Sequence, residues 1–450
     1  MSEPTLAIYE YKDHPGSHTL EVARQYGAYE SMRQVLADND PDGTINIVKD
    51  SGLRGRGGAG FGCGLKWSFM PKDDGKPHFL VVNADEGEPG TFKDREILRE
   101  VPHKMIEGII IGCHAIRASK AFIYVRGEFW REYLVLEQAI KDCYAHGLLG
   151  KNILGSGFDC DIVLHRGAGA YICGEETALL DSLDGKRGHP RMKPPFPAQA
   201  GAFGLPTTIN NVETLAAVPA IMKYGPAWYK SFGTEKSPGT KIFSLSGHVN
   251  KPGNYETPLG IPLSALINEY GGGMRGGRAF KAVMPGGGSS QWLGDEHWNV
   301  ALDYEALRTA GTMLGSGAVM PMDETTCIVE GVWRLSKFFQ HESCGKCTPC
   351  FEGTWWIERM LRRILVGEGR PEDPDTLVGA ANNMEGKSFC PFGDAAAWPV
   401  QSTIKRWRDE FDYHIHHPGT CPVKGHGAHE YARAHAAIAP QPWAREYATV

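Results

Sequence analysis

The chain has 450 residues, 42% hydrophobic and 22% charged, which is enough for roughly two to four packed domains. Its net charge of -6 argues against a binder of nucleic acid or of an anionic membrane, because either partner requires a basic surface. No apolar run approaches the roughly 18 residues of a membrane-spanning helix, and residues 1–16 lack the features of an export signal. The 11 cysteines, an odd number spread along the chain, indicate reduced thiols in the cytosol rather than a disulfide framework.

Residues 1–63 form the first predicted region, with a helix over residues 20–35 and a glycine-rich loop at its end. In the next region, residues 64–236, β-rich apolar runs alternate with segments of helical spacing. The strands are predicted at 78–84, 121–127 and 159–167, and the helices at 95–118, 130–148 and 174–183. This alternation predicts parallel strands with helices on both faces, a doubly wound α/β domain.

The pattern changes at about residue 237. Residues 237–325 contain a predicted hairpin around the turn Pro252-Gly253, a helix over 262–273 and a strand at 280–288, an arrangement that indicates a β-grasp (ubiquitin-like) domain. Residues 326–450 are predicted to form a helical domain with a C-terminal tail, and its helices are expected at 327–339, 354–365 and 394–411. The expected fold is therefore a multidomain α/β protein.

Three cysteines, Cys344, Cys347 and Cys350, form the pattern C-x2-C-x2-C. A short loop of this kind can supply three of the four thiolates of a [4Fe–4S] cluster, whereas zinc sites are usually built from two separate pairs. Cys390, followed by a proline, is the preferred fourth ligand; Cys327 and Cys421 are the alternatives. A zinc site and ordinary reduced thiols remain the competing interpretations of the pattern.

Gly55, Gly57 and Gly60 match G-x-G-x-x-G, the dinucleotide-binding pattern. We expect a helix before this loop and none after it, so the strand–loop–helix context of that pattern is missing. The glycines still let the backbone approach a flat ligand or a phosphate, unless the segment is simply a mobile surface loop. Side chains expected to add positive charge or stacking faces are Arg54, Arg56, Lys66, Phe61, Trp67 and Phe69.

Polar motifs follow the predicted strands, where open α/β sheets bind ligands. They are NADEGEPG at 83–90, GAGAYICGEETALL at 167–180 and TTINNVETL at 207–215. Glu175 and Glu176 fall in a first helical turn, where acids also simply complement the helix dipole. The carboxylates would equally suit a divalent metal, but no nucleotide-hydrolase motif accompanies them.

Together with KPPFPA and ESCGKCTPC, these motifs resemble the NADH-binding flavoprotein subunit (the F subunit) of respiratory complex I (NADH:quinone oxidoreductase), in the family's order from about residue 27 to residue 411. The resemblance implies a Rossmann-like domain in which NADH stacks on a noncovalently bound FMN. The implied FMN contacts are Gly55, Gly57, Lys66, Asn83, Asp85, Tyr171, Gly174, Glu175, Asn210, Asn211 and Thr214. The implied NADH contacts are Phe61, Lys66, Phe69, Glu88, Glu176 and Phe196. It also implies that Cys344, Cys347, Cys350 and Cys390 bind one [4Fe–4S] cluster.

The implied activity is hydride transfer from NADH to FMN, then transfer of single electrons through the cluster towards quinone, with no side chain as general acid or base. The implied partners are a thioredoxin-like [2Fe–2S] subunit and a large multi-cluster iron–sulfur subunit, in a peripheral arm on the cytoplasmic side of the inner or plasma membrane. The alternatives are a diaphorase subunit of an NAD-linked hydrogenase or formate dehydrogenase, and a non-catalytic iron–sulfur relay or scaffold.

Two features depart from the family pattern. The family's loop reads GFxTGLKW where this chain has GFGCGLKW, so Cys63 adds a thiol beside the predicted flavin. This thiol puts the oxidation resistance of the loop in question. A histidine-rich tail lies largely outside the resemblance, and we expect a solvated tail rather than a metal site. Its histidines are His414, His416, His417, His426, His429 and His435.

Overall fold

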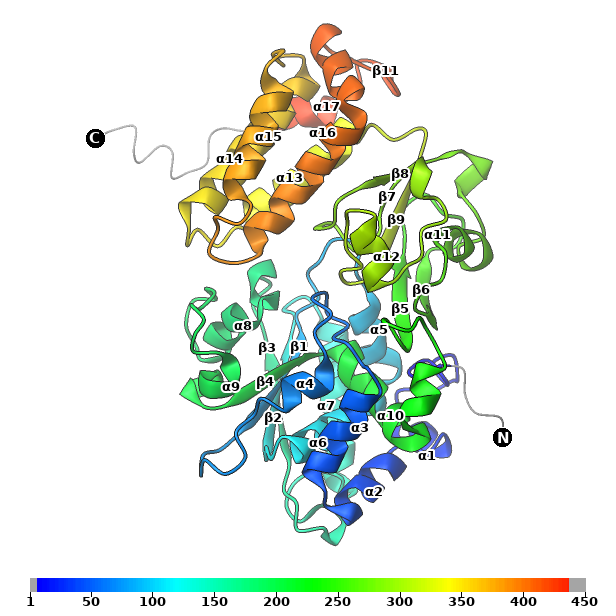
Figure 1. Cartoon of the computed structure of the whole chain (residues 1–450), viewed down its shortest axis with the longest axis vertical. Helices are drawn as coiled ribbons and strands as arrows, with labels where there is room; N and C mark the ends of the chain where they lie inside the picture. Colours follow the sequence, from blue (N-terminus) through cyan, green and yellow to red (C-terminus); the bar gives the residue numbers. More distant parts are fainter. Residues whose placement is uncertain (1–5, 437–450) are drawn as a thin grey trace, which may run out of the picture. The chain divides into compact units, whose positions relative to one another are not determined.

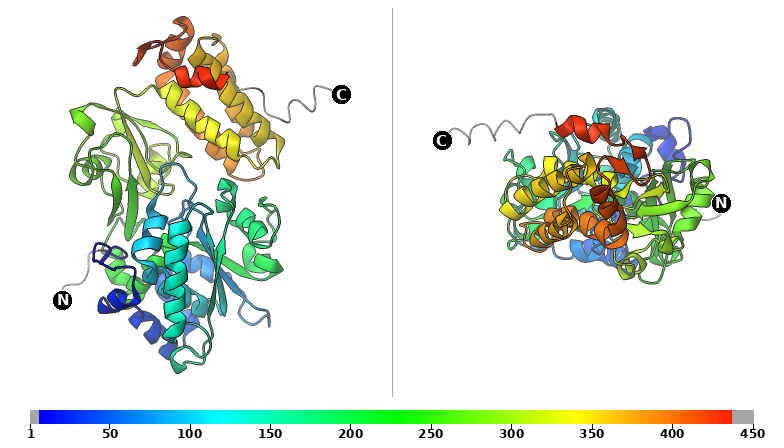
Figure 2. Two further views of the ribbon diagram at one scale, coloured as in Figure 1. Left: turned by 180° about the vertical axis from the view of Figure 1, so that it is seen from behind. Right: turned by 90° about the horizontal axis from the view of Figure 1, so that it is seen from above.

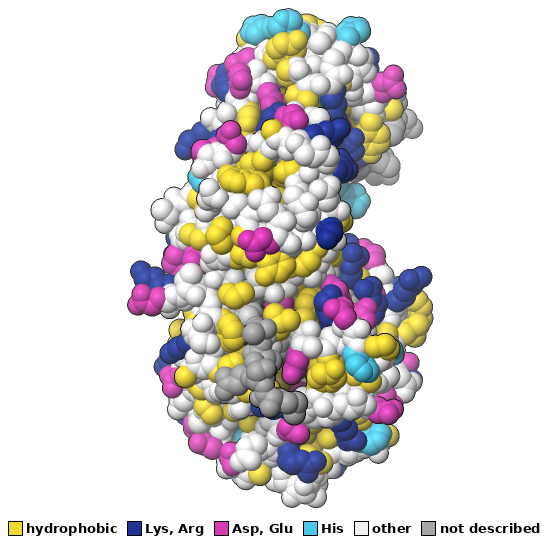
Figure 3. Space-filling view, turned by 90° about the vertical axis from the view of Figure 1, so that its right-hand side faces the viewer, with side chains coloured by type: hydrophobic (Ala, Val, Ile, Leu, Met, Phe, Trp, Pro, Cys, Tyr) yellow, Lys and Arg dark blue, Asp and Glu magenta, His cyan; other side chains and the backbone are white. Residues whose placement is uncertain are grey.

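The computed structural model describes residues 6–436 of the chain (Figure 1). These residues fall into two compact units, one formed by residues up to 278 together with 282–321, the other by 279–281 together with the residues from 322 on. Among the described residues no helix is both long enough and apolar enough to span a bilayer. On the face drawn in Figure 3, acidic and basic side chains are interspersed rather than segregated.

The first unit begins with three helices, α1 (Leu20–Gln25), α2 (Glu30–Asp38) and α3 (Pro41–Asp50). The prediction of one continuous helix over residues 20–35 is therefore wrong. The backbone turns left-handed at Gly27 (φ 80°) and Tyr29 (φ 69°), which ends the first helix and starts the second.

A parallel sheet of four strands occupies the middle of this unit: β1 (Phe79–Ala84), β2 (Lys120–Val125), β3 (Asp161–Arg166) and β4 (Thr207–Asn211). The three predicted strands are confirmed, and β4 is an additional one. The order is β3-β2-β1-β4: β2 and β3 extend the sheet on one side of β1, and β4 lies on its other side. The strand order therefore switches between β1 and β4. The carboxyl ends of two such neighbouring strands open a crevice, the usual ligand site of open parallel sheets.

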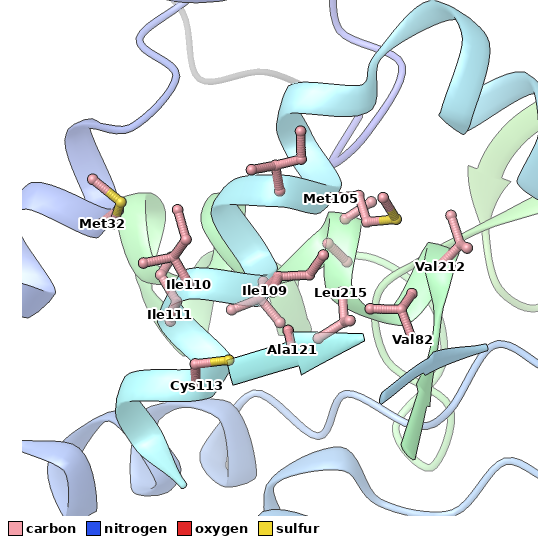
Figure 4. Packing of buried hydrophobic residues seen from close by; sticks show 14 of the residues in the cluster. Met32, Val82, Met105, Ile109, Ile110, Ile111, Cys113, Ala121, Val212 and Leu215 are labelled. Carbon is pink, nitrogen blue, oxygen red and sulfur yellow. The ribbon is translucent and has the colours of Figure 1, made fainter. Parts of the chain in front are cut away.

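One face of the sheet is covered by the long helices α6 (Pro102–Ala115), α7 (Trp130–Ala145) and α10 (Val212–Lys230), and the shorter α5 (Lys93–Glu100) packs against α7 and α10. Val82 and Ala121 point from the strands into this layer and pack with Ile109 and Leu215 (Figure 4). The predicted helix over 95–118 is interrupted before Pro102, because the residue that precedes a proline disfavours the helical conformation.

The opposite face of the sheet carries shorter elements, α8 (Glu176–Leu183), α9 (Pro197–Ala200) and a 3-10 turn (Ala202–Gly204). Phe79 and Phe122 contact Phe203 of this turn, and the hydroxyl of Tyr124 lies 2.8 Å from that of Ser182 on α8. Both faces are therefore covered, as the alternating pattern predicts, but the second cover is short and irregular.

A second sheet follows, made of β5 (Thr240–Leu245), β6 (Gly253–Pro258), β7 (Phe280–Met284), β8 (Leu293–Gly294) and β9 (Ala318–Asp323) in the order β6-β5-β9-β7-β8. The predicted hairpin is confirmed as the antiparallel pair β5–β6. β9 was not predicted, yet it pairs in parallel with β5. The expected helix over 262–273 forms as α11 (Leu263–Ala265) and a π-helical turn (Leu266–Tyr270), and α12 (Tyr304–Thr309) comes later.

The second unit is helical, with α13 (Ile328–Glu342), α14 (Thr348–Val366), α15 (Asp373–Met384) and α16 (Phe392–His416) packed together (Figure 2). The three predicted helices are confirmed, and α15 is additional. A small hairpin of β10 (Thr420–Cys421) and β11 (Gly425–His426) and the helix α17 (Glu430–Ala436) complete the unit. The finer division of the chain at residues 63, 236 and 325 stays a prediction.

Candidate functional site

The glycine-rich segment is a closed loop. The Gly55 amide donates to the Phe61 carbonyl at 2.7 Å, and the Cys63 amide donates to the Leu53 carbonyl at 2.8 Å. A Cβ on Gly57 would lie 2.9 Å from the Cβ of Asn211, at the carboxyl end of β4. Only glycine therefore lets the loop approach the end of the strand this closely.

The loop runs directly into a short helix, α4 (Cys63–Trp67), so the expectation that no helix follows the glycines is wrong. A side chain on Gly64 would clash with the backbone of Lys49, which shows how closely α4 packs on α3. Trp67, fully buried, ends α4 and donates from its indole nitrogen to Asn210 Oδ1 at 2.8 Å. The element before the loop is α3, as expected, so the strand–loop–helix order of the ordinary dinucleotide motif is still not met.

Two arginines expected to supply positive charge for phosphates serve the fold instead. Arg56 is 1% exposed, and its guanidinium donates to the Thr240 carbonyl at 2.9 Å and to the Tyr229 hydroxyl at 2.9 Å. Arg54 pairs with Glu305 at 2.7 Å. Lys66 differs from both: it is partly exposed and donates to the Ile209 carbonyl of β4 at 3.1 Å.

Asn83 links the first two polar motifs at the end of β1. Its side-chain Nδ2 donates to the Gly174 carbonyl at 2.8 Å, and its Oδ1 accepts from the backbone amide of Asp85 at 3.1 Å. Asn83 also lies opposite Asn211 in the β1–β4 register. The end of β1, the end of β4 and the segment before α8 therefore meet at one place, as the strand-end argument predicts.

Glu88 joins this region to a loop of the second sheet. Its carboxylate accepts from the Tyr171 hydroxyl at 2.6 Å, and from the amide and the hydroxyl of Ser289 at 2.7 Å and 2.6 Å. Burial raises the pKa of Glu88, although these bonds act in the opposite direction. A Cβ on Gly87 would lie 2.9 Å from Tyr171 Cδ2, so the backbone and the tyrosine ring are in close contact.

The two glutamates at the start of α8 have different partners. Glu175 is the N-cap, and its Oε2 accepts from the amides of Thr177 and Ala178 at 2.9 Å each. Glu175 therefore caps the helix, and only Glu176 lies in the first turn, where acids complement the helix dipole. Glu176 forms a short ion pair with Lys193, whose ammonium also lies 3.8 Å from Glu175.

Side chains of the TTINNVETL motif hold the glycine loop and α4 in place through hydrogen bonds. The Asn210 amide also donates to Cys63 Sγ at 3.6 Å, the Asn211 amide donates to Asp94 at 2.7 Å, and Thr214 Oγ1 accepts from the Arg56 amide at 2.9 Å. Burial raises the pKa of Cys63 to about 12, so it stays protonated. A buried thiol without thiolate character is a poor target for oxidation, which answers the question that this substitution posed.

A buried ionic network behind Asn211 is not predicted from the sequence, because its members are far apart in the chain. Lys93 lies 2.6 Å from Asp94 and 2.9 Å from Glu213, and Glu213 lies 3.1 Å from Lys241. Each of these four side chains is at most 5% exposed. The network joins the parallel sheet to β5 of the second sheet.

Three aromatic side chains near these motifs face solvent: Phe61 is 45% exposed, Phe69 56% and Phe196 55%. The ring centroids of Phe61 and Phe69 are 6.1 Å apart. Exposed apolar rings that lie together often mark a ligand or partner surface. They offer stacking faces for a planar ligand.

In the second unit, Cys344 and Cys347 lie in the loop before α14, Cys350 in its first turn and Cys390 just before α16. The Phe389 amide, next to Cys390, donates to Cys347 Sγ at 3.5 Å, so the segment that carries Cys390 lies against the loop of the other three cysteines. The hydroxyl of Ser343 lies 3.2 Å from Cys350 Sγ. The two alternative cysteines, Cys327 and Cys421, form a different cluster with His414 and His429.

Comparison with known protein families matches three parts of the chain. Residues 48–220 match the Nuo51 FMN-binding domain, residues 242–293 the SLBB domain, and residues 330–414 the NADH-ubiquinone oxidoreductase-F iron-sulfur binding region. The first match includes the glycine loop and the strand ends, and the last includes the four clustered thiols.

Similar proteins of known name and of known structure agree with these matches. The NADH-quinone oxidoreductase F subunit of Streptomyces coelicolor is 55% identical over 93% of this chain and 92% of its own length. The protein of the same name from Rickettsia typhi is 52% identical over 89% of this chain and 95% of its own length. The NAD+-reducing [NiFe]-hydrogenase in the H2-reduced state matches with a TM-score of 0.80 at 36% identity, over 96% of this chain and 72% of that one. With matches of this identity and coverage, the chain belongs to the family of NADH-quinone oxidoreductase F subunits.

Proposed function

We propose that this chain is the NADH-oxidising subunit of a respiratory NADH:quinone oxidoreductase. Bound FMN would supply the acceptor for the hydride of NADH, and a bound [4Fe–4S] cluster would supply single-electron transfer towards quinone. The protein's own task is to bind and orient the cofactors and to keep water away from them. The observation that carries this proposal is that one chain of this family holds both a glycine loop at the carboxyl ends of β1 and β4 and four cysteines within its iron-sulfur binding region.

The carboxyl ends of β1 and β4, with the glycine loop beside them, suit a flavin mononucleotide. Closely packed glycines let the backbone reach a flat ring, Lys66 supplies a cation at the rim, and Asn83 supplies polar groups at the end of β1. Asn210 and Thr214 also hold the loop in place, through hydrogen bonds with Trp67, Cys63 and Arg56. The proposed FMN contacts remain Gly55, Gly57, Lys66, Asn83, Asp85, Tyr171, Gly174, Glu175, Asn210, Asn211 and Thr214.

NADH would lie over the flavin on the solvent side of the loop. The exposed rings of Phe61, Phe69 and Phe196 support this, because base–aromatic stacking is worth about 1–3 kcal/mol per base. The proposed NADH contacts are these three and Lys66, Glu88 and Glu176. Glu176, paired with Lys193, would have to exchange that partner to reach a ribose.

The four thiols of the second unit fit a [4Fe–4S] cluster by the chemistry of the donor set. Cys344, Cys347, Cys350 and Cys390 would hold it, and the Phe389 amide, which donates to Cys347 Sγ at 3.5 Å, would stabilise thiolate charge. The grouping of Cys327 and Cys421 with two histidines supports Cys390 as the fourth ligand.

The finer fold assignments belong to this proposal. The order β3-β2-β1-β4 supports a Rossmann-like domain over residues 64–236, because it matches part of the 3-2-1-4-5-6 order of that fold. The hairpin β5–β6 and the parallel pair β5–β9 support a β-grasp domain over residues 237–325. Residues 1–63 would then be an N-terminal segment with the glycine loop, and residues 326–450 the helical domain of the cluster.

As a member of this family, the chain works within the multisubunit enzyme. We propose a thioredoxin-like [2Fe–2S] subunit and a large multi-cluster iron–sulfur subunit as its neighbours, on the cytoplasmic side of the membrane. A diaphorase subunit of a hydrogenase is the second candidate, favoured by the structural match. The higher identity to the F subunits of NADH-quinone oxidoreductases favours complex I.

A visible spectrum of the purified chain tests the activity. A flavin band that bleaches on anaerobic addition of NADH, above a broad iron–sulfur absorption, is the expected result. An iron–sulfur band with no flavin and no response to NADH would instead identify a relay or scaffold. Co-purification from membranes with NADH:quinone activity, rather than with hydrogenase activity, separates the two enzyme candidates.

A further inference from the structure

A second group of metal-ligand side chains lies in the helical unit, apart from the four thiols assigned to the iron–sulfur cluster. Cys327, His414, Cys421 and His429 bring their ligand atoms within 4.8 Å of one another. They come from separate elements: the N-cap of α13, the last turn of α16, the strand β10 and the residue before α17. We propose that these four residues form a structural zinc site.

The distances within the cluster suit a single tetrahedral ion. Cys327 Sγ lies 3.3 Å from His414 Nε2 and 3.9 Å from His429 Nε2. Tetrahedral zinc with Zn–S and Zn–N bonds of ordinary length has an S···N edge of about 3.6 Å. Two thiolates and two imidazoles are a donor set that zinc favours over magnesium or calcium, which take oxygen ligands.

Contacts around the donors orient them as ligands. His429 Nδ1 lies 3.0 Å from a carboxylate oxygen of Glu330, which leaves Nε2 facing the sulfur of Cys327. A carboxylate behind a histidine in this way is a usual feature of zinc sites. The Glu330 amide, in the first turn of α13, donates to Cys327 Sγ at 3.4 Å, and such a bond favours the thiolate.

The surrounding segment has almost no core of its own. From residue 416 to residue 434, only Cys421 and Ala432 are buried as whole residues, and His429 adds a buried side chain. The strands β10 and β11 have two residues each, and His429 has a left-handed backbone (φ 73°). Segments with so little buried apolar surface depend on a metal or another cross-link for order, and a zinc ion would fasten this one to α13 and α16.

The site is distinct from the iron–sulfur region of the family. That family model ends at residue 414 and begins at residue 330, so Cys327, Cys421 and His429 lie outside it. Our expectation that the histidine-rich tail is simply solvated is wrong for His414, which is 2% exposed, and for His429, whose side chain is 2% exposed. It holds for His416, His417 and His426, which are exposed, while the side chain of His435 lies outside the described residues.

Metal analysis of the full-length holoprotein tests the proposal. After anaerobic purification and dialysis against metal-free buffer, we expect about one zinc per chain beside the cluster iron. Zinc-edge X-ray absorption should show two sulfur neighbours near 2.3 Å and two nitrogen neighbours near 2.0–2.1 Å. The technique is specific for zinc, so flavin and iron do not interfere.

Variants then assign the ligands. Cys421→Ser and His429→Gln should lose at least about four fifths of the zinc while iron is retained, and their residues 417–436 should be cleaved faster by added protease. His426→Gln is the matched control, since it removes an exposed imidazole from the same hairpin and should keep the zinc.

Three results would overturn the assignment: wild-type protein that holds no zinc even after incubation with one equivalent of Zn2+, a zinc spectrum without sulfur neighbours, or a Cys327–Cys421 disulfide found by mass spectrometry in the anaerobic protein. The wild-type measurements decide the question even if the cysteine variant fails to fold.

Discussion

Trp67 and Asn210 are joined by a buried hydrogen bond of 2.8 Å from the indole nitrogen to the amide oxygen. Trp67 is the last residue of α4, and Asn210 lies on β4. The bond therefore fixes the exit of the glycine loop on the sheet, and the Asn210 amide nitrogen meets Cys63 at the start of the same helix. Trp67 and Asn210 thus position the loop that we assign to the flavin, in addition to the FMN contact proposed for Asn210.

Replacing Trp67 by phenylalanine should destabilise the first unit. The substitution leaves a buried amide oxygen without its donor, which costs about 1–3 kcal/mol in the free energy of unfolding. Urea unfolding followed by FMN release measures this, and the FMN content of the purified variant should fall as well. Trp356→Phe is the control, because Trp356 is 54% exposed, and its unfolding should match the wild type. Equal stability of the Trp67 variant would show that the bond contributes nothing.

Removing the exposed ring of Phe69 should weaken NADH binding. If the ring stacks on the adenine, Phe69→Ala should raise KM for NADH about tenfold with a small change in kcat. Steady-state NADH:ferricyanide kinetics give both constants. Trp130→Ala, which removes a ring that is 49% exposed on α7, should leave KM unchanged. If both variants behaved alike, Phe69 would have no place in the nucleotide site.

Cys347→Ser should separate the two halves of the activity. Without this thiolate the second unit cannot hold a complete cluster, but the flavin site in the first unit is untouched. NADH:ferricyanide activity should therefore stay near the wild-type value, whereas NADH:quinone activity of the assembled enzyme should fall below about one tenth. Cys113→Ala, which removes a buried thiol from α6, should retain both activities. Full quinone activity in the Cys347 variant would contradict the ligand assignment.

Glu86 should make stability depend on pH. Burial, followed by the charge of Asp94, raises its pKa to about 7, although the amides of Asp94 and Arg95 donate to the carboxylate. The folded protein thus keeps a proton that the unfolded chain, with a pKa near 4.5, releases. This contribution to stability is complete below pH 4.5 and is lost as the pH rises to about 7.

Glu86→Gln removes that titration. As the pH rises from 5 to 8, the Tm of the variant minus the Tm of the wild type should therefore increase. Thermal unfolding at several pH values measures the difference. Glu128→Gln is the control, because the Glu128 side chain is 52% exposed and its Tm difference should be constant. A pH-independent difference for Glu86→Gln would show that Glu86 is already ionised at pH 5.

Elements with strong local patterns were predictable from the sequence. β1, β2 and β3 are apolar runs between helices, and α13 and α14 have helical spacing on either side of the cysteine pattern. The spacing of Cys344, Cys347 and Cys350 narrowed the chemistry for the same reason: ligands on one short loop are close in space whatever the rest of the chain does.

Elements that depend on distant partners were missed. α4 has five residues, too few for a helical period, and it depends on contacts with α3 and β4. β9 contains Pro321, which argues against a central strand. It nevertheless lies between β5 and β7, where it pairs with β5. A short segment takes the structure that its neighbours impose, and no local pattern records those neighbours.

The residues alone were sufficient to identify the family and to group Cys344, Cys347 and Cys350, because each motif consists of side chains that are near one another along the chain. Folding decided the rest: Arg56 is turned inward to carbonyl groups, and Cys327 and Cys421 meet two histidines of the tail. These pairings span large sequence separations. They arise because burial obliges each polar group to find a partner, and only the folded chain brings that partner within reach.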